Sequence, residues 1–148
     1  MIFNDTVTVY NRRFKTVFQP PKPPAQDAVF ERTVIKGVMW RDRVQINPTP
    51  EGAAFVGQSV SVTIPVEADQ SGKAYMSPPD FARLHQDDHS CWTLRTNESY
   101  PDIIVYGEAP EITEHYTEKQ LMRDYKYMHP RAVSDSSNQS VLPQWKVV

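Results

Sequence analysis

The segment Arg32–Arg41, with the sequence RTVIKGVMWR, constrains the fold of this chain more than any other. It is dense in β-branched and aromatic residues, which pack well in strands. Its apolar side chains fall on both faces of a strand, with Val34, Val38 and Trp40 on one parity and Ile35 and Met39 on the other. Glycine is unusual inside a strand, so Gly37 predicts a bulge or a sharp bend. We therefore expect a central strand, covered on both faces, in a tightly coiled sheet or a small barrel.

Strand patterns recur on both sides of this segment. They cover Asp5–Arg13, Ser59–Val66, Ser90–Thr96, Asp102–Glu108 and Leu142–Val148. Residues 59–66 alternate most regularly, which is typical of a strand with one buried and one solvated face. Residues 90–96 and 102–108 flank a turn-rich segment and predict a hairpin with a longer loop. Residues 41–57 contain two prolines and predict a loop that returns into a weak strand.

Two segments carry the signals of a helix start. Ser77 is followed by two prolines and an aspartate, which predicts a short helix at about residues 78–85. Thr117 and Gln120 form the pattern of a capping box and predict a longer helix at about residues 118–128. The expected fold is a single, mainly β domain over residues 1–148. It is a small β-barrel or a coiled antiparallel sheet with long loops.

Proline is unusually frequent, with thirteen prolines against five glycines. Residues 14–27 include QPPKPPA, which favours an extended polyproline-like arm or loop. This segment is either a surface connection or a stiff projection that reaches a neighbouring subunit. Residues 131–140 are polar and predict a flexible loop.

The composition bounds the class of protein. Cys91 is the only cysteine, so no internal disulfide is expected. The N-terminal residues lack a signal-peptide pattern and no apolar run approaches the roughly 20 residues that span a bilayer, so we expect a protein that folds in a reducing cytoplasm, away from membranes. The net charge is −2 with both signs interspersed, which gives no broad electrostatic surface for nucleic-acid binding.

Candidate reactive residues are few. His85, His89 and Cys91 have the side-chain types of zinc ligands, but structural zinc sites usually have four ligands and no second cluster is present. A polar turn is the favoured interpretation, and a small metal-dependent β-barrel enzyme using these three residues is kept as an alternative. We expect no enzyme activity and no cofactor. Four acidic residues, Asp102, Glu108, Glu111 and Glu114, are interpreted as a solvated acidic rim.

Aromatic residues beside turns or termini have two interpretations. They are Tyr100, Tyr116, Tyr127 and Trp145. Either they cap the ends of a small barrel, or they anchor a protein–protein interface, where such side chains are enriched.

Several phrases taken in order resemble the small head–tail connector proteins of tailed bacteriophages and prophages, the stopper and head-completion proteins. They are DTVTVYNRR, RTVIKGVMW, SVSVTIPV, YMSPPDFARL, CWTLRTNESYPDIIVYGE and the closing WKVV. The resemblance implies a compact β-barrel without catalytic residues, assembled as a structural virion protein in the phage neck. It also implies a tail-completion or tail-terminator subunit of the same assembly as the alternative.

The resemblance further implies the partners and the location. The chain would form a homo-oligomeric ring with a portal-bound adaptor below and a tail-completion or tail-tube protein above. DNA would pass through the channel without specific recognition, and the ring would help to close the capsid exit after packaging. Assembly would occur in the bacterial host cytoplasm and end at the head–tail junction of the virion. Interface candidates are Pro20, Pro21, Pro23 and Pro24 together with the four aromatic residues above, and the four acidic residues are candidates for the channel wall.

Overall fold

The computed structural model describes residues 3–48, 54–96, 99, 101–138 and 143–148. In chain order these form β1 (Asp5–Val17), β2 (Ala25–Pro48), β3 (Ala54–Pro65), β4 (Ala74–Tyr75), α1 (Pro78–Ala82), β5 (Cys91–Trp92), β6 (Ile103–Tyr106), α2 (Glu118–Asp124), β7 (Tyr127–Met128), β8 (Val133–Asp135) and β9 (Gln144–Val147). The expectation of a mainly β protein with two helices is confirmed.

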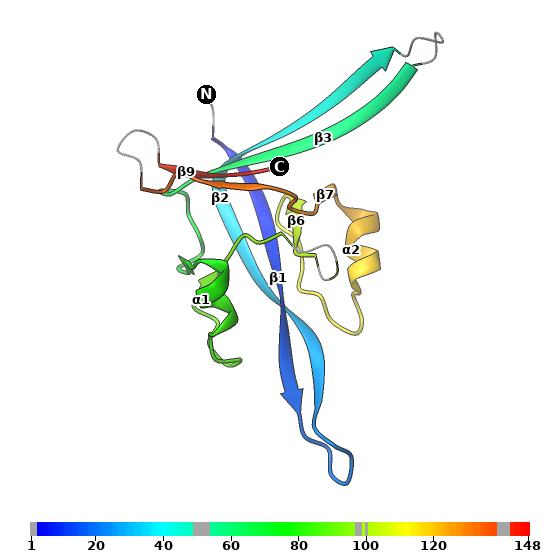
Figure 1. Cartoon of the computed structure of the whole chain (residues 1–148), viewed down its shortest axis with the longest axis vertical. Coiled ribbons are helices and arrows are strands. Elements are labelled where there is room, and N and C mark those ends of the chain that lie inside the picture. Colours follow the sequence, from blue (N-terminus) through cyan, green and yellow to red (C-terminus); the bar gives the residue numbers. More distant parts are fainter. Residues whose placement is uncertain (1–2, 49–53, 97–98, 100, 139–142) are drawn as a thin grey trace.

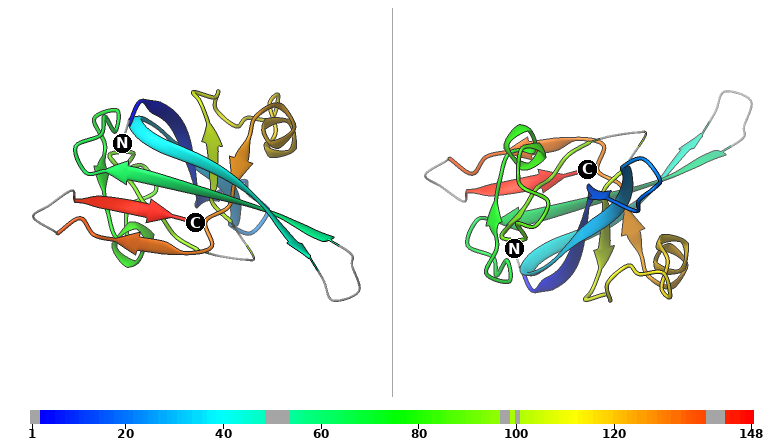
Figure 2. Two further views of the ribbon diagram at one scale, coloured as in Figure 1. Left: turned by 90° about the horizontal axis from the view of Figure 1, so that it is seen from above. Right: turned by 90° about the horizontal axis from the view of Figure 1, so that it is seen from below.

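Seven of the strands form one antiparallel sheet in the order β7-β6-β1-β2-β3-β9-β8. β7 and β8 are the two edges of this sheet, so it is a coiled sheet rather than a closed barrel. The strands change direction strongly as the sheet coils, as the end views in Figure 2 show. A separate pair, β4 and β5, is parallel.

β2 is the central strand and belongs to two hairpins. Its first part pairs with β1 over Ala25–Val38, and its second part pairs with β3 over Met39–Pro48. The two hairpins diverge from the body of the protein (Figure 1). The prediction of a loop is therefore wrong for residues 41–48, which belong to β2, whereas the weak strand expected at the end of segment 41–57 is confirmed, because β3 begins at Ala54. Pro48, Pro50 and Gly52 are the sequence signals that suggest a longer loop, and residues 49–53 lie outside the described residues.

Gly37 lies where β2 changes partner. The register shifts from Asp5 opposite Val38 to Thr6 opposite Lys36, so Gly37 is the extra residue of a β-bulge with a φ of 90°. The predicted bulge is confirmed. It also shifts the parity of the strand, because Ile35 and Val38 pack in the same core cluster although they are an odd number of positions, three, apart.

Two core clusters lie on opposite faces of β6. The larger one includes Val9, Ile35, Trp40, Val62, Ile64, Trp92, Ile104, Trp145 and Val147. The smaller one includes Tyr10, Ile103, Val105 and Leu121, and α2 covers it. Trp145 and Val147 share the buried face of β9, as the sequence pattern predicts. These clusters fix the strands from which the hairpins project.

Two local predictions need correction. β5 and β6 do not form a hairpin, because β5 pairs with β4 whereas β6 pairs with β1 and β7. The polar segment 131–140 contains β8, which pairs with β9. Residues 139–140 of that segment lie outside the described residues.

Both helices begin where predicted and end early. α1 begins after Ser77, whose hydroxyl donates to Asp80 Oδ2 rather than capping a backbone N–H. α2 has the predicted capping box of Thr117 and Gln120. It ends at Asp124 because Tyr125 is extended, with φ −128° and ψ 151°, and leads into the pairing of β7 with β6. Neither described helix has the length and apolar character needed to cross a membrane.

Candidate interaction site

The end of the β1–β2 hairpin projects beyond the rest of the sheet. We call residues 14–28 the arm and Phe18–Pro24 the arm tip. β6 pairs with β1 only as far as Tyr10, so the arm is a two-stranded ribbon. The tip is a turn closed by a hydrogen bond from Lys22 N to Gln19 O, 2.9 Å long. The expected polyproline-like segment is thus replaced by a β-hairpin with a proline-rich turn.

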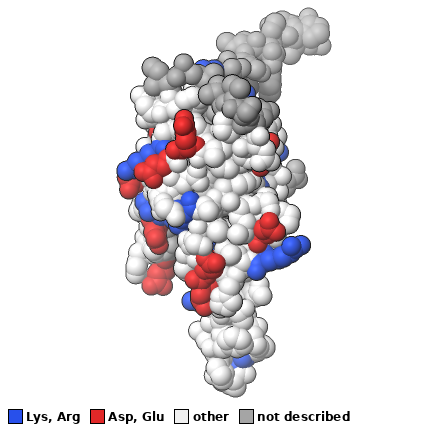
Figure 3. Space-filling model, turned by 90° about the vertical axis from the view of Figure 1, so that its left-hand side faces the viewer, with Lys and Arg blue, Asp and Glu red and all other residues white. Residues whose placement is uncertain are grey.

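The arm exposes apolar side chains. Every residue from Phe18 to Val29 is exposed, and the exposed fractions of Phe14 and Phe18 are 47% and 70%. All four predicted interface prolines lie in this exposed turn. The arm tip carries little charge (Figure 3), and Lys22 is its one charged residue. A two-stranded ribbon alone in water is marginally stable, so an arm of this kind is suited to packing against another surface.

The arm root, the strand pairs that join Asn11–Arg13 to Val29–Glu31, contains the buried charged residues Arg13 and Glu31. Glu31 is 6% exposed, and its carboxylate accepts a 2.7 Å hydrogen bond from Lys73 Nζ. His89 Nδ1 lies 2.7 Å from the other carboxylate oxygen. Burial alone would raise the pKa of Glu31, but the hydrogen bonds with Lys73 and His89 outweigh it and lower the pKa below 4.5.

Arg13 connects the root to the segment after α1. Its guanidinium donates to the carbonyl oxygens of Asp88 and His85 at 2.6 and 2.7 Å, and lies 3.5 Å from Glu31. Gln86 Oε1 from the same segment accepts from the backbone N–H of Thr16. These contacts fix the direction in which the arm leaves the body.

The three candidate zinc ligands have other roles in the structure. His89 contacts Glu31, and His85 Nδ1 accepts from the backbone N–H of Asp87. Cys91 is buried in β5. Within the described residues no three His, Cys, Asp or Glu side chains are grouped so that they could hold a metal ion. Residues 85–91 therefore brace the arm root.

Asp102 is the centre of a second buried network. It is 1% exposed and accepts from Asn11 Nδ2 at 3.0 Å, from the backbone N–H of Arg12 at 2.9 Å and from Arg95 Nε at 2.9 Å. Its assignment to a solvated acidic rim is wrong, because these donors hold its carboxylate inside the protein. Glu108, Glu111 and Glu114 are exposed as expected.

The aromatic interface candidates differ in how far they are exposed. Trp145 is 4% exposed and packs with Tyr75 and Trp92 at ring-centre distances of 4.5 and 5.4 Å, so it is a core residue. Tyr116 is partly buried and donates to Asp124 Oδ2. Tyr127 is 42% exposed. Tyr100 lies outside the described residues.

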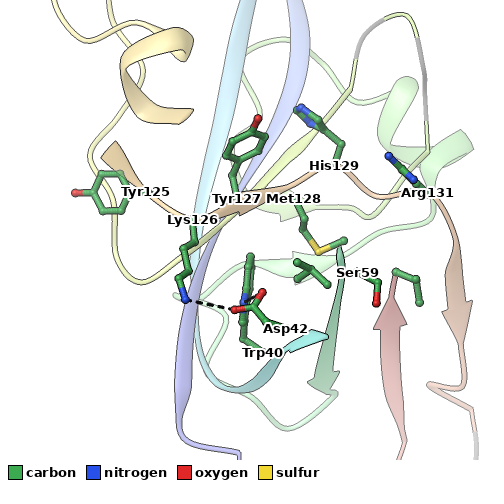
Figure 4. A pocket seen from close by; sticks show the side chains of 11 residues that line it. Trp40, Asp42, Ser59, Tyr125, Lys126, Tyr127, Met128, His129 and Arg131 are labelled. Atoms are coloured by element: carbon green, nitrogen blue, oxygen red, sulfur yellow. Dashed lines mark hydrogen bonds and ion pairs between the residues drawn. The ribbon is translucent and has the colours of Figure 1, made fainter. Parts of the chain in front are cut away.

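A pocket lies where the β2–β3 hairpin leaves the body. Its volume is about 540 Å³ and its walls come from β2, β3, the segment around β7 and the end of β9. Figure 4 shows Asp42 and Lys126 meeting beside Trp40, with Tyr127, Met128 and His129 on the β7 side. The Asp42 carboxylate lies 3.3 Å from Lys126 Nζ and accepts from Trp40 Nε1. The pocket thus combines aromatic walls with an oriented carboxylate.

Sequence reasoning missed the arm root and this pocket. Glu31 shares the parity of Ile35, which indicates an inward position, but its partners Lys73 and His89 are about 40 and 60 residues away. The pocket joins residues from four separate parts of the chain, so no local pattern marks it. The exposed Phe14 and Phe18 lie in the arm, and the only sequence signal for them is an aromatic residue beside a proline-rich segment.

The described fold is that of a mainly β protein with a projecting hairpin arm. A model of the family DUF6751, a family of unknown function, matches residues 2–148. The chain therefore belongs to this family. No curated protein and no solved structure matches the chain.

Proposed function

We propose that this protein is a structural subunit of the phage neck, a stopper-type connector. It would form a homo-oligomeric ring between the portal-bound adaptor and the tail and help to close the capsid exit after DNA packaging. The proposal starts from the resemblance of its strand phrases to head–tail connector proteins. A tail-completion or tail-terminator subunit of the same neck is the alternative within this class.

The observation that carries the proposal is the arm. It presents the apolar side chain of Phe18 on a ribbon with which no third strand pairs among the described residues, while its root is fixed by buried charged groups. A monomer gains nothing from holding such a surface in a defined direction. A ring subunit does, because head-to-tail contacts close a ring only when the rotation between neighbours is fixed.

The exposed glutamates suggest which surface lines the channel. Glu108 and Glu114 are 62% and 86% exposed, and Glu111 lies between them in the same segment. Negative side chains repel DNA phosphates, so a channel wall of this kind would let DNA slide without tight binding. We assign these three residues to the channel wall of the proposed ring.

Electron cryomicroscopy of intact particles of the phage or prophage that encodes this chain tests the proposal. We expect a ring of this subunit at the head–tail junction, with each arm on a neighbouring subunit and residues 108–114 at the lumen. The layer in which the ring lies distinguishes the stopper from the tail-completion subunit. Absence of the chain from the particles would refute the proposed function.

A further inference from the structure

The three exposed glutamates belong to a segment without regular secondary structure. Residues 107–114, which we call the acidic segment, directly follow β6 and form neither helix nor strand. The side chains of Glu108, Glu111 and Glu114 all point into solvent. An irregular segment keeps a defined shape only where contacts with the rest of the fold hold its backbone. The acidic segment has such contacts along its first half.

The start of the acidic segment is bound to β1. The Gly107 N–H donates to the Thr6 carbonyl oxygen at 2.7 Å, which extends the pairing of β6 with β1 by one hydrogen bond. The hydroxyl of the fully buried Thr8 donates to the Gly107 carbonyl oxygen at 2.8 Å and accepts from the Ala109 N–H at 3.1 Å. Ala109 is itself only 2% exposed. Thr8 therefore fixes the direction in which the chain leaves β6.

Two further donors hold the next two carbonyl groups. Arg32 Nε donates to the Ala109 carbonyl oxygen at 2.6 Å. The Tyr10 hydroxyl donates to the Pro110 carbonyl oxygen, also at 2.6 Å. Tyr10 and Arg32 are opposite each other in the pairing of β1 with β2, so their side chains leave the same face of the sheet. Burial raises the pKa of Tyr10 to about 12, so its hydroxyl stays protonated and donates at neutral pH.

We infer that Tyr10 and Arg32 are positioning residues for the acidic segment. They hold its backbone against the sheet, Ile112 packs on the smaller core cluster, and the glutamate side chains are left on the outside. The inference rests on the proposed function and names the residues that position the surface assigned to the channel wall. A mobile segment could turn its carboxylates away from the DNA, whereas a fixed one presents the same negative surface in every subunit.

The ion pair of Arg32 is a minor part of this role. Arg32 Nη2 lies 4.0 Å from Glu108 Oε1, and the two side chains are 26% and 62% exposed. An ion pair at this distance and exposure contributes little stability. The hydrogen bond to the Ala109 carbonyl oxygen is the contact through which Arg32 holds the segment.

Hydrogen–deuterium exchange measured by mass spectrometry tests the inference. Tyr10→Phe keeps the aromatic ring in the smaller core cluster and removes the hydroxyl that binds Pro110. Arg32→Met is the second variant, because it removes the other donor at a side chain that is partly exposed. The matched control is Tyr116→Phe, since Tyr116 packs against the same cluster but its hydroxyl donates to the last residue of α2.

We expect peptides that cover residues 107–114 to exchange about two- to tenfold faster in Tyr10→Phe and in Arg32→Met than in the wild type, because each variant loses one hydrogen bond of the segment. Peptides from β3 and β9 should exchange at the wild-type rate, which separates local release of the segment from a loss of global stability. Tyr116→Phe should leave the exchange of residues 107–114 unchanged.

Wild-type exchange of residues 107–114 in both variants would overturn the inference. So would faster exchange that affects β3 and β9 equally, because the two residues would then stabilise the whole fold without positioning the segment. Either result leaves the proposed function standing. Release of the segment in the variants, with no ring of this chain in intact particles, would refute the connector and retain the positioning role.

Discussion

The two ends of the β1–β2 hairpin are stabilised in different ways. The root is buried and charged, with Glu31 and Asp102 only 6% and 1% exposed, and each carboxylate is held by several donors from other parts of the chain. The tip is exposed and nearly uncharged, and contacts within its own turn hold its shape. The difference indicates that the fold fixes the direction of the arm and leaves the tip for contact with another molecule.

The largest effect is expected at Asp102, which accepts hydrogen bonds from Asn11 and Arg12 of the root. Asp102→Ala would remove the acceptor of the Arg12 backbone N–H and of Arg95 Nε, and one of the two acceptors of Asn11 Nδ2. Removing one partner of a buried charge network costs about 3–5 kcal/mol, so we expect the free energy of unfolding to fall by that amount. Urea denaturation of the variant and the wild type measures it. A loss below about 1 kcal/mol would show that the root is not fixed by this network.

A somewhat smaller effect is expected at Glu31. Glu31→Gln keeps the shape of the side chain but removes the charge that pairs with Lys73 and Arg13. We expect destabilisation by about 3 kcal/mol in urea denaturation. Asp27→Asn, an exposed acidic residue in the arm, is the matched control and should change stability by less than about 0.5 kcal/mol. Equal effects of the two variants would contradict the contrast between root and tip.

Acid should weaken the root through Glu31. Its pKa is lowered in the folded protein, so its stabilising contribution is present above the ordinary value of 4.5 and is lost as the pH falls through the lower, folded value. Arg13, Lys73 and His89 are the charged or titratable groups that face it. We therefore expect the stability difference between the wild type and Glu31→Gln to shrink below pH 4.5. Denaturation curves across this range would contradict the prediction if the difference stayed constant.

The smallest effect on stability is expected at the tip. Phe18 is 70% exposed, so Phe18→Ala should change the free energy of unfolding by less than about 0.5 kcal/mol. Phe81, which is 2% exposed and lies 5.3 Å from the Arg13 guanidinium, is the contrasting residue. Phe81→Ala should cost about 3–5 kcal/mol.

Self-association, unlike stability, should depend on Phe18. Phe18→Ala is expected to weaken the association of copies, as measured by sedimentation velocity over a range of concentrations. An unchanged association constant would remove Phe18 from the proposed contact.

Prediction from the sequence succeeded where the signal was local. The bulge at Gly37, the capping box at Thr117 and the buried face of β9 each depend on a few neighbouring residues. It failed for the proposed hairpin of residues 90–96 and 102–108, because β5 and β6 find other partners. The candidate site was predicted only in part: the proline-rich tip was recognised, whereas the pocket was not.

The sequence by itself determined that the chain is mainly β, where both helices begin, and that Gly37 marks a bulge in the central strand. Alternation, capping and proline geometry are properties of adjacent residues, so they can be read along the chain. Only the tertiary structure decided that Asp102 and Glu31 are buried and that the pocket wall draws on β2, β3 and β7. Those outcomes depend on which distant segments meet, since a carboxylate remains ionised inside a protein only where distant donors are brought to it.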